Sequence, residues 1–98
     1  MSTTYLTLYD QTGDAETRER LRSEHIAYRR SLGNALLMAG PLLNDEGDAV
    51  GSVIMINASD ATQANSVATA DPYVKAGVLK LRSITPMRVA KMVPPTTT

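Results

Sequence analysis

The sequence predicts a small α+β domain with the element order strand, helix, strand, strand, helix, strand, which is a split β-α-β arrangement. Residues 14–32 contain no proline or glycine and open with acidic side chains, as is typical of a helix. Residues 50–57 mix β-branched side chains in a run long enough to cross a sheet. Residues 59–70 and 78–84 then repeat the helix-to-strand pattern. Together these runs favour a sheet with two helices.

Length, charge and composition limit the classes of protein. The chain has 98 residues, and a chain this short buries only about 60–65% of its unfolded surface, so we expect one domain over residues 1–93 that forms a homodimer. Ten basic residues balance ten acidic ones and are scattered, which argues against nucleic acid as a partner. Without cysteine there is neither a thiolate nucleophile nor a cysteine-ligated metal. We expect no membrane association and a cytoplasmic location, because the start lacks signal-peptide features and no apolar run approaches about 20 residues.

The first strand is predicted at residues 5–9, where aromatic and β-forming side chains precede a turn at residues 10–14. Its two tyrosines share one face with Thr7, whereas Leu6 and Leu8 share the other. We therefore expect an apolar leucine face and a second face able to meet a polar cavity.

The first helix is predicted to present the only histidine to the interior. The spacing of a single helical face is followed by Leu21, His25, Tyr28 and Leu32. The flanks and outside of the helix are expected to carry Arg18, Arg22, Arg29 and Arg30. His25 is the one side chain whose ordinary pKa lies close to neutrality, so a functional role competes with that of a half-buried core residue.

The second strand is predicted to be short. Residues 35–39 are all apolar and are followed by Gly40 and Pro41, which predicts a strand buried on both faces and ended by a turn. Gly40 also permits close approach of a ligand or of another backbone. Residues 44–48 lack the length and ligand spacing of a calcium loop, so we expect a solvated hairpin.

The third strand and the second helix follow directly. Gly51, early in the strand at residues 50–57, indicates a bulge or the close passage of a neighbouring strand. Asp60 lies in an N-cap signal, and small side chains continue the helix to Ala70.

Residues 71–77 combine an N-cap aspartate, a proline and a glycine. Pro72 suits the first helical position, Asp71 can accept from the exposed N–H groups of that turn, and Gly77 supplies a left-handed stop. The pattern predicts one helical turn with a rigidly placed carboxylate at its start.

The last strand is predicted at residues 78–84, where apolar and polar side chains alternate. Pro86 allows only an edge strand or an irregular continuation, and the tail at residues 94–98 is predicted to be disordered. The complete order is that of a ferredoxin-like βαββαβ sandwich. Both helices would cover one sheet face, so we expect a second subunit to cover the other.

Four segments in this order and spacing carry a resemblance to a known family. They are residues 22–25 (RSEH), 39–42 (AGPL), 51–52 (GS) and 71–78 (DPYVKAGV). The sequence resembles the YCII-related (YciI-like) family from the first strand to about Val89. The resemblance implies a dimeric α+β barrel with a site centred on His25 and Asp71, and one branch of the family includes a dehydrochlorinase that acts on chlorinated hydroxyhydroquinone.

A carboxylate beside an imidazole fixes its tautomer and raises its basicity, which suits proton transfer on a small substrate. His25 and Asp71 are therefore the candidate catalytic residues, with no metal or other cofactor. The candidate substrate-binding residues are Arg22, Gly40, Pro41, Ser52 and Tyr73. Alternative roles are an ordinary strand serine for Ser52 and a helix anchor for Tyr73.

Three functions compete. The first is a cofactor-free lyase, isomerase or dehydrochlorinase-like enzyme in which His25 is the general acid/base and Asp71 orients it. The second is a non-catalytic dimeric module that binds a small metabolite in the same cavity. A cofactor-independent monooxygenase is less favoured, because the chain has neither tryptophan nor phenylalanine for an aromatic pocket.

Overall fold

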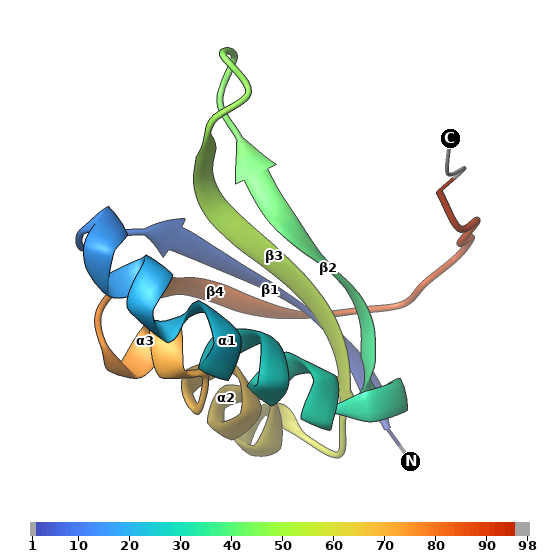
Figure 1. Ribbon diagram of the computed structural model, residues 1–98. Coiled ribbons are helices and arrows are strands. Elements are labelled where there is room, and N and C mark those ends of the chain that lie inside the picture. The colour runs from blue at the N-terminus through green and yellow to red at the C-terminus, as the bar shows by residue number, and fades with distance from the viewer. Residues whose placement is uncertain (1, 96–98) are drawn as a thin grey trace.

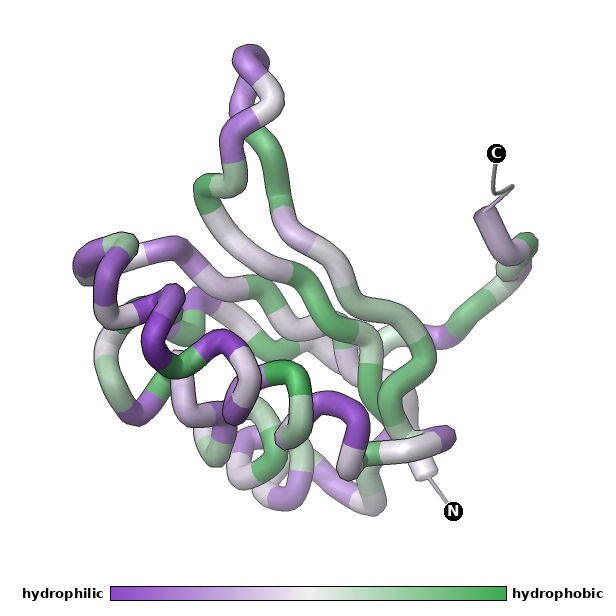
Figure 2. Tube along the Cα trace, in the orientation of Figure 1, coloured by the Kyte–Doolittle hydropathy of each residue, from purple (hydrophilic) through white to green (hydrophobic). Residues whose placement is uncertain are grey.

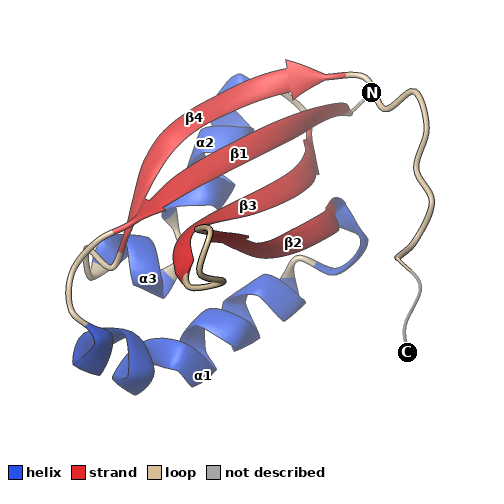
Figure 3. Ribbon diagram, turned by 90° about the horizontal axis from the view of Figure 1, so that it is seen from above, coloured by secondary structure: helices blue, strands red, loops and turns tan. Residues whose placement is uncertain are grey.

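A computed structural model describes residues 2–95 and shows a four-stranded antiparallel sheet with its helices on one face (Figures 1 and 3). The strands are β1 (Thr3–Gln11), β2 (Leu36–Leu43), β3 (Ala49–Ala58) and β4 (Leu79–Met87). The helical elements are α1 (Ala15–Ser31), η1 (Gly33–Ala35), α2 (Ala61–Thr69) and α3 (Pro72–Lys75). The part of the predicted tail at residues 96–98 lies outside the described residues.

The sheet order is β2-β3-β1-β4, with β1 paired to both β3 and β4. Each half of the chain therefore contributes a strand, a covering helix and a further strand, and the two halves interleave at the centre of the sheet. The predicted α+β, ferredoxin-like class is confirmed. No helix among residues 2–95 is long and apolar enough to cross a membrane.

The core lies between the sheet and the helices, and β1 enters it with the face carrying the tyrosines. Tyr5, Thr7 and Tyr9 are buried, whereas the leucines between them are only partly so. The tyrosine face, which was expected to meet a polar cavity, therefore also forms part of the core. A tyrosine can bury its ring if its hydroxyl finds a partner, and the hydroxyl of Tyr9 donates to the carbonyl oxygen of Ala68 at 2.9 Å.

Each of the three helices begins at an aspartate whose carboxylate accepts a backbone N–H. The pairs are Asp14 with Thr17, Asp60 with Gln63 and Asp71 with Tyr73. An N-cap of this kind satisfies one of the free N–H groups of the first turn. The predicted caps at Asp60 and Asp71 are confirmed, as is the left-handed stop at Gly77, whose φ is 78°.

The second strand differs from its prediction. β2 continues through Gly40 and Pro41 to Leu43, and most of its side chains are exposed in this chain, so the predicted turn and the burial of both faces were wrong. β2 is an edge strand, where a proline removes no hydrogen bond that a neighbour needs. Pro86 lies in the other edge strand, β4, as its sequence position predicted.

Apolar and polar residues separate along the chain as this arrangement requires. Figure 2 shows hydrophilic residues along α1 and at the tip of the β2–β3 hairpin, and hydrophobic residues along the strands. None of the residues of α1 is fully buried. A cavity lies under part of this helix.

Candidate functional site

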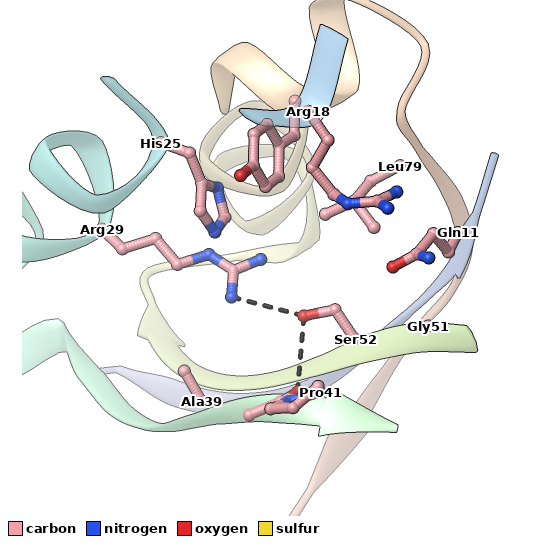
Figure 4. A pocket seen from close by; sticks show the side chains of 11 residues that line it. Gln11, Arg18, His25, Arg29, Ala39, Pro41, Gly51, Ser52 and Leu79 are labelled. Carbon is pink, nitrogen blue, oxygen red and sulfur yellow. Dashed lines mark hydrogen bonds between the residues drawn. The ribbon is translucent and has the colours of Figure 1, made fainter. Parts of the chain in front are cut away.

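A cavity of about 250 Å³ opens between α1, α3 and the sheet (Figure 4). Its lining consists of Gln11, Arg18, His25, Arg29, Ala39, Gly40, Pro41, Gly51, Ser52, Tyr73 and Leu79. These residues come from six elements, so folding brings together segments that are far apart in the sequence. Four of the predicted substrate-binding residues are among them: Gly40, Pro41, Ser52 and Tyr73.

His25 and Asp71 meet beside this cavity. The Nδ1 atom of His25 lies 2.8 Å from both carboxylate oxygens of Asp71, although the residues are 46 positions apart. The side chain of Asp71 is 2% exposed, and that of His25 is 15% exposed. The approach predicted for this pair is therefore present, with the carboxylate buried and the imidazole reaching the cavity.

Asp71 is held by its own helix start. Its Oδ1 atom accepts the backbone N–H of Tyr73 at 2.9 Å, which fixes the carboxylate against α3. Since the carboxylate also accepts from Arg29, it acts here as an acceptor, and Nδ1 of His25 is the donor. In the neutral imidazole, the proton on Nδ1 leaves Nε2 with a lone pair.

The ring of Tyr73 supports the imidazole from one side. The two ring centroids are 3.9 Å apart, and the planes differ by 7°, which is a stacked arrangement. Tyr73 thus links the two partners, because its backbone holds Asp71 while its ring holds His25. Two independent contacts therefore restrict the orientation of the imidazole.

Arg29, like Arg18, was expected on the flanks or outside of α1 and instead lines the cavity. Its side chain is 12% exposed and lies over the ring of Tyr9, 5.7 Å from the ring centroid. Its Nε donates to Oδ2 of Asp71 at 3.2 Å. Four residues after His25 it is on the same helical face, and that spacing was the available signal.

A chain of hydrogen bonds continues from Arg29 to the sheet. Nη1 of Arg29 donates to Oγ of Ser52 at 3.3 Å, and this hydroxyl is within 3.4 Å of the carbonyl oxygen of Gly40 (Figure 4). Nη2 of Arg29 is buried and has no partner among the described residues. Ser52 is therefore tied to the pair through Arg29 instead of being an isolated strand serine.

Burial keeps the tyrosines around the site protonated. Desolvation raises the pKa of Tyr9 far above its ordinary value, although the charge of Arg29 partly opposes this. Desolvation also raises the pKa of Tyr28 and of Tyr73. The hydroxyl of Tyr28 donates to the carbonyl oxygen of Val67 at 2.7 Å, which ties α1 to α2.

Arg22 does not lie with the other predicted residues. It is exposed and lines a separate surface hollow together with Glu19 and Arg30. The cavity instead contains Arg18 and Gln11, which the sequence did not single out. Among residues 2–95 no group of three or more His, Cys, Asp or Glu side chains is arranged to hold a metal ion.

Comparison with known proteins agrees with this fold. The chain is similar to the solved structure of 5-chloro-2-hydroxyhydroquinone dehydrochlorinase from Burkholderia phenoliruptrix AC1100 in complex with 2,5-dihydroxybenzoquinone, with 24% sequence identity and a TM-score of 0.65. The match covers 88% of this chain and 92% of the other. No curated protein matches the chain. The family model of the YCII-related domain matches residues 3–88, and the chain therefore belongs to the YCII-related domain family.

Proposed function

We propose that this protein is an enzyme that carries out acid/base chemistry on a small molecule without a cofactor, as a lyase, an isomerase or a dehydrochlorinase. The observation that carries the proposal is the contact between His25 and Asp71, in which a buried carboxylate binds one imidazole nitrogen beside a cavity. This arrangement leaves the second nitrogen available to a substrate. A positioned imidazole of this kind typically contributes 10²–10⁴-fold to a rate.

The proposed roles follow from the contacts. His25 removes a proton through Nε2 and returns it at another position or to a leaving group. Asp71 positions the ring and stabilises the imidazolium that forms, and it keeps Nδ1 protonated throughout. Ser52 would accept a hydrogen bond from a substrate hydroxyl, because its own proton is donated to the carbonyl oxygen of Gly40 while its oxygen also accepts from Arg29.

The similarity to a dehydrochlorinase supports an elimination. In such a step the base takes a proton from the substrate, the electrons of the broken bond form a double bond, and chloride leaves with its bonding pair. An isomerisation begins with the same proton removal and returns the proton elsewhere. Neither reaction exchanges electrons with another molecule, so the chemistry needs no redox partner.

A non-catalytic binding module is the second candidate, and the contact of Arg29 favours it. Arg29 shares the carboxylate of Asp71 with His25, and a guanidinium at 3.2 Å neutralises part of the charge that would make the imidazole a stronger base. In that function the same side chains would bind a metabolite without moving a proton. The cytoplasmic location expected from the sequence remains a prediction in either case.

The test is a survey of small carbonyl, hydroxyl and chlorinated compounds incubated with the protein in D₂O and followed by proton NMR. An active compound will lose a C–H signal or release chloride. His25→Gln and Asp71→Asn should reduce the rate by at least about 10²-fold while the compound still binds.

Asp60→Asn is the matched control, since Asp60 is also an N-cap aspartate but, unlike Asp71, does not contact His25. Its rate should equal that of the wild type. Binding of a compound that never exchanges or eliminates, and that is weakened in His25→Gln, would favour the binding module.

A further inference from the structure

We infer that the substrate is a small organic acid and that its carboxylate binds Arg18. This inference rests on the proposed function, because it names the class of molecule that the same cavity accepts. Arg18 and His25 line the same cavity from one face of α1. The acid group would be held at one end of the cavity while the reacting carbon lies at the imidazole.

The charged side chains that line the cavity are of one sign. Arg18 and Arg29 line it beside His25, and no aspartate or glutamate does so among the described residues. Arg29 already has a carboxylate partner, Asp71, which also contacts Nδ1 of the imidazole. Arg18 is therefore the cation whose charge the cavity leaves unmatched.

Arg18 has no carboxylate within 4 Å in the part of the chain that the structure describes. Asp14 is close enough for Arg18 to contribute, as the smallest of several causes, to the lowered pKa of the Asp14 carboxyl, but the two do not form an ion pair. The side chain of Arg18 makes no hydrogen bond within residues 2–95 either. Its guanidinium is free to bind a ligand.

The spacing along α1 sets the distance between the two ends of the ligand. Arg18 precedes His25 by seven residues, which is two helical turns, or about 10 Å along the axis. Figure 4 shows Arg18 extending into the cavity toward Gln11, while Arg29 enters from the opposite side. An acid group at Arg18 would therefore point the rest of the molecule toward His25 and Ser52.

Gln11 lies at the same end of the cavity as Arg18 (Figure 4). One N–H of its amide donates to the carbonyl oxygen of Ala49 at 3.0 Å, which fixes the amide. A guanidinium presents parallel N–H groups that match the two oxygens of a carboxylate. A single unmatched cation fits a singly charged carboxylate better than the double charge of a phosphate ester.

The volume limits the remainder of the ligand. An apolar cavity of about 150 Å³ can hold benzene, so about 250 Å³ accommodates one ring or a short chain together with an acid group. Leu79, Ala39 and the ring of Tyr73 supply apolar wall between the charged ends. The ligand class is thus a small acid with a compact apolar body.

Titration of isotope-labelled protein with pairs of acids and amides tests this inference without requiring turnover. The probes are benzoate against benzamide and butanoate against butanamide, which differ in charge but hardly in shape, with phenyl phosphate as a further arm. The ring signals of the only histidine report binding. In the wild type at least one acid should bind about tenfold more tightly than its amide, as expected for a charge-assisted contact, and phenyl phosphate should bind more weakly than benzoate.

Arg18→Gln should abolish the preference for the acid, and Arg18→Lys should restore part of it. Arg20→Gln is the matched control, because Arg20 is exposed on the same helix and does not line the cavity. His25→Gln should retain the preference, followed through the backbone signals of Ser52. If the proposed chemistry fails, acid binding will still be observed, so the two failures are distinguishable.

Equal binding of acid and amide in both pairs would overturn the inference, as would an acid preference that survives in Arg18→Gln. Absence of any response to either acid up to its solubility limit would overturn it too. Tighter binding of phenyl phosphate than of benzoate would also overturn the inference, because it would indicate a phosphate ester as the ligand class instead of a carboxylate.

Discussion

At the scale of single residues, Asp71 determines the character of the site. Its carboxylate is almost fully buried and accepts from His25, from Arg29 and from the backbone N–H of Tyr73. A buried charge with several donors is stabilised, but losing one donor leaves part of it unmatched. Arg29 therefore stabilises the buried carboxylate of Asp71 alongside the imidazole of His25.

Removing Arg29 should destabilise the protein measurably. We expect Arg29→Met, which keeps most of the apolar volume, to lower the free energy of unfolding by about 2 kcal/mol, because a charge-assisted hydrogen bond to a buried carboxylate is lost. Urea denaturation measures this. Arg30→Met, at the next position and exposed, should change it by less than about 0.5 kcal/mol. Equal effects of the two substitutions would show that the contact to Asp71 contributes nothing to stability.

At the scale of elements, the site is positioned by the starts of the helices and by the close approach of β3 to its neighbour β1. No residue of α1 is fully buried, and its N-cap and its hydrogen bond to α2 help to hold it in place. β3 passes so close to β1 that a side chain at Gly51 would meet the carbonyl oxygen of Tyr9. Ser52 follows Gly51 directly, and its position therefore depends on this close approach of the two strands.

The N-cap of α1 should make stability depend on acid pH. Hydrogen bonds from Thr17 lower the pKa of Asp14 below its ordinary 3.8. A carboxyl whose pKa is lower in the folded than in the unfolded protein stabilises the fold at pH values above its unfolded-state pKa. This stabilisation is lost as the pH falls through the folded-state pKa. The stability advantage of the wild type over Asp14→Asn should therefore shrink as the pH is lowered from neutrality to below 3.8. A difference that stays constant in urea denaturation over this range would contradict the cap's role.

A methyl group at Gly51 should disturb the sheet. We expect Gly51→Ala to lower the free energy of unfolding by about 1–3 kcal/mol, because β1 and β3 must move apart. Gly40→Ala is the matched control, since nothing lies within 4 Å of the added carbon there, and it should be nearly neutral. Thermal denaturation of the two variants checks the contrast, and a neutral Gly51→Ala would mean that the strands are not held at this spacing.

At the scale of the whole molecule, one sheet face has no helix over it (Figure 3). Leu6, Leu8, Val53 and Met55 are partly exposed there, on the strand positions that alternate with the buried ones. A sheet of this kind is normally covered on its apolar face. The open face is thus the surface on which a second copy of the chain would pack.

We therefore predict a homodimer formed through this face. Light scattering at micromolar concentration should give twice the mass of the chain, and Val53→Lys at the centre of the face should give a folded monomer, because a charge there would be buried without a partner. A lysine at exposed Ala27, on the helical side, should leave the dimer intact. A monomeric wild type that is folded would contradict the prediction.

Much of the fold could be predicted because local signals agree with it. The helix caps at Asp60 and Asp71 and the left-handed Gly77 are all set by short-range chemistry. The path of β2 was not predictable in this way. Whether Pro41 ends a strand or lies in an edge strand depends on the sheet order, which the sequence of β2 does not contain.

The candidate site was predictable in part for the same reason. Short stretches of sequence predict the helical face on which His25 lies and the N-cap at Asp71. These two placements together predicted the contact between the side chains. The direction of a long side chain cannot be predicted from helical spacing alone, because an arginine at the border of a helical face can reach either solvent or a cavity. Arg29 and Arg18 turn to the cavity whereas Arg22 does not, and only the packed structure distinguishes them.

The proposed chemistry depends on Asp71 keeping the proton of a neutral His25 on Nδ1, so that Nε2 is free for a substrate. Nitrogen-15 NMR of the only histidine, at a pH where the ring is neutral, measures this directly. We expect the Nδ1–H tautomer in the wild type and loss of that preference in Asp71→Ala. An Nε2–H tautomer in the wild type, or the same tautomer in both proteins, would contradict it.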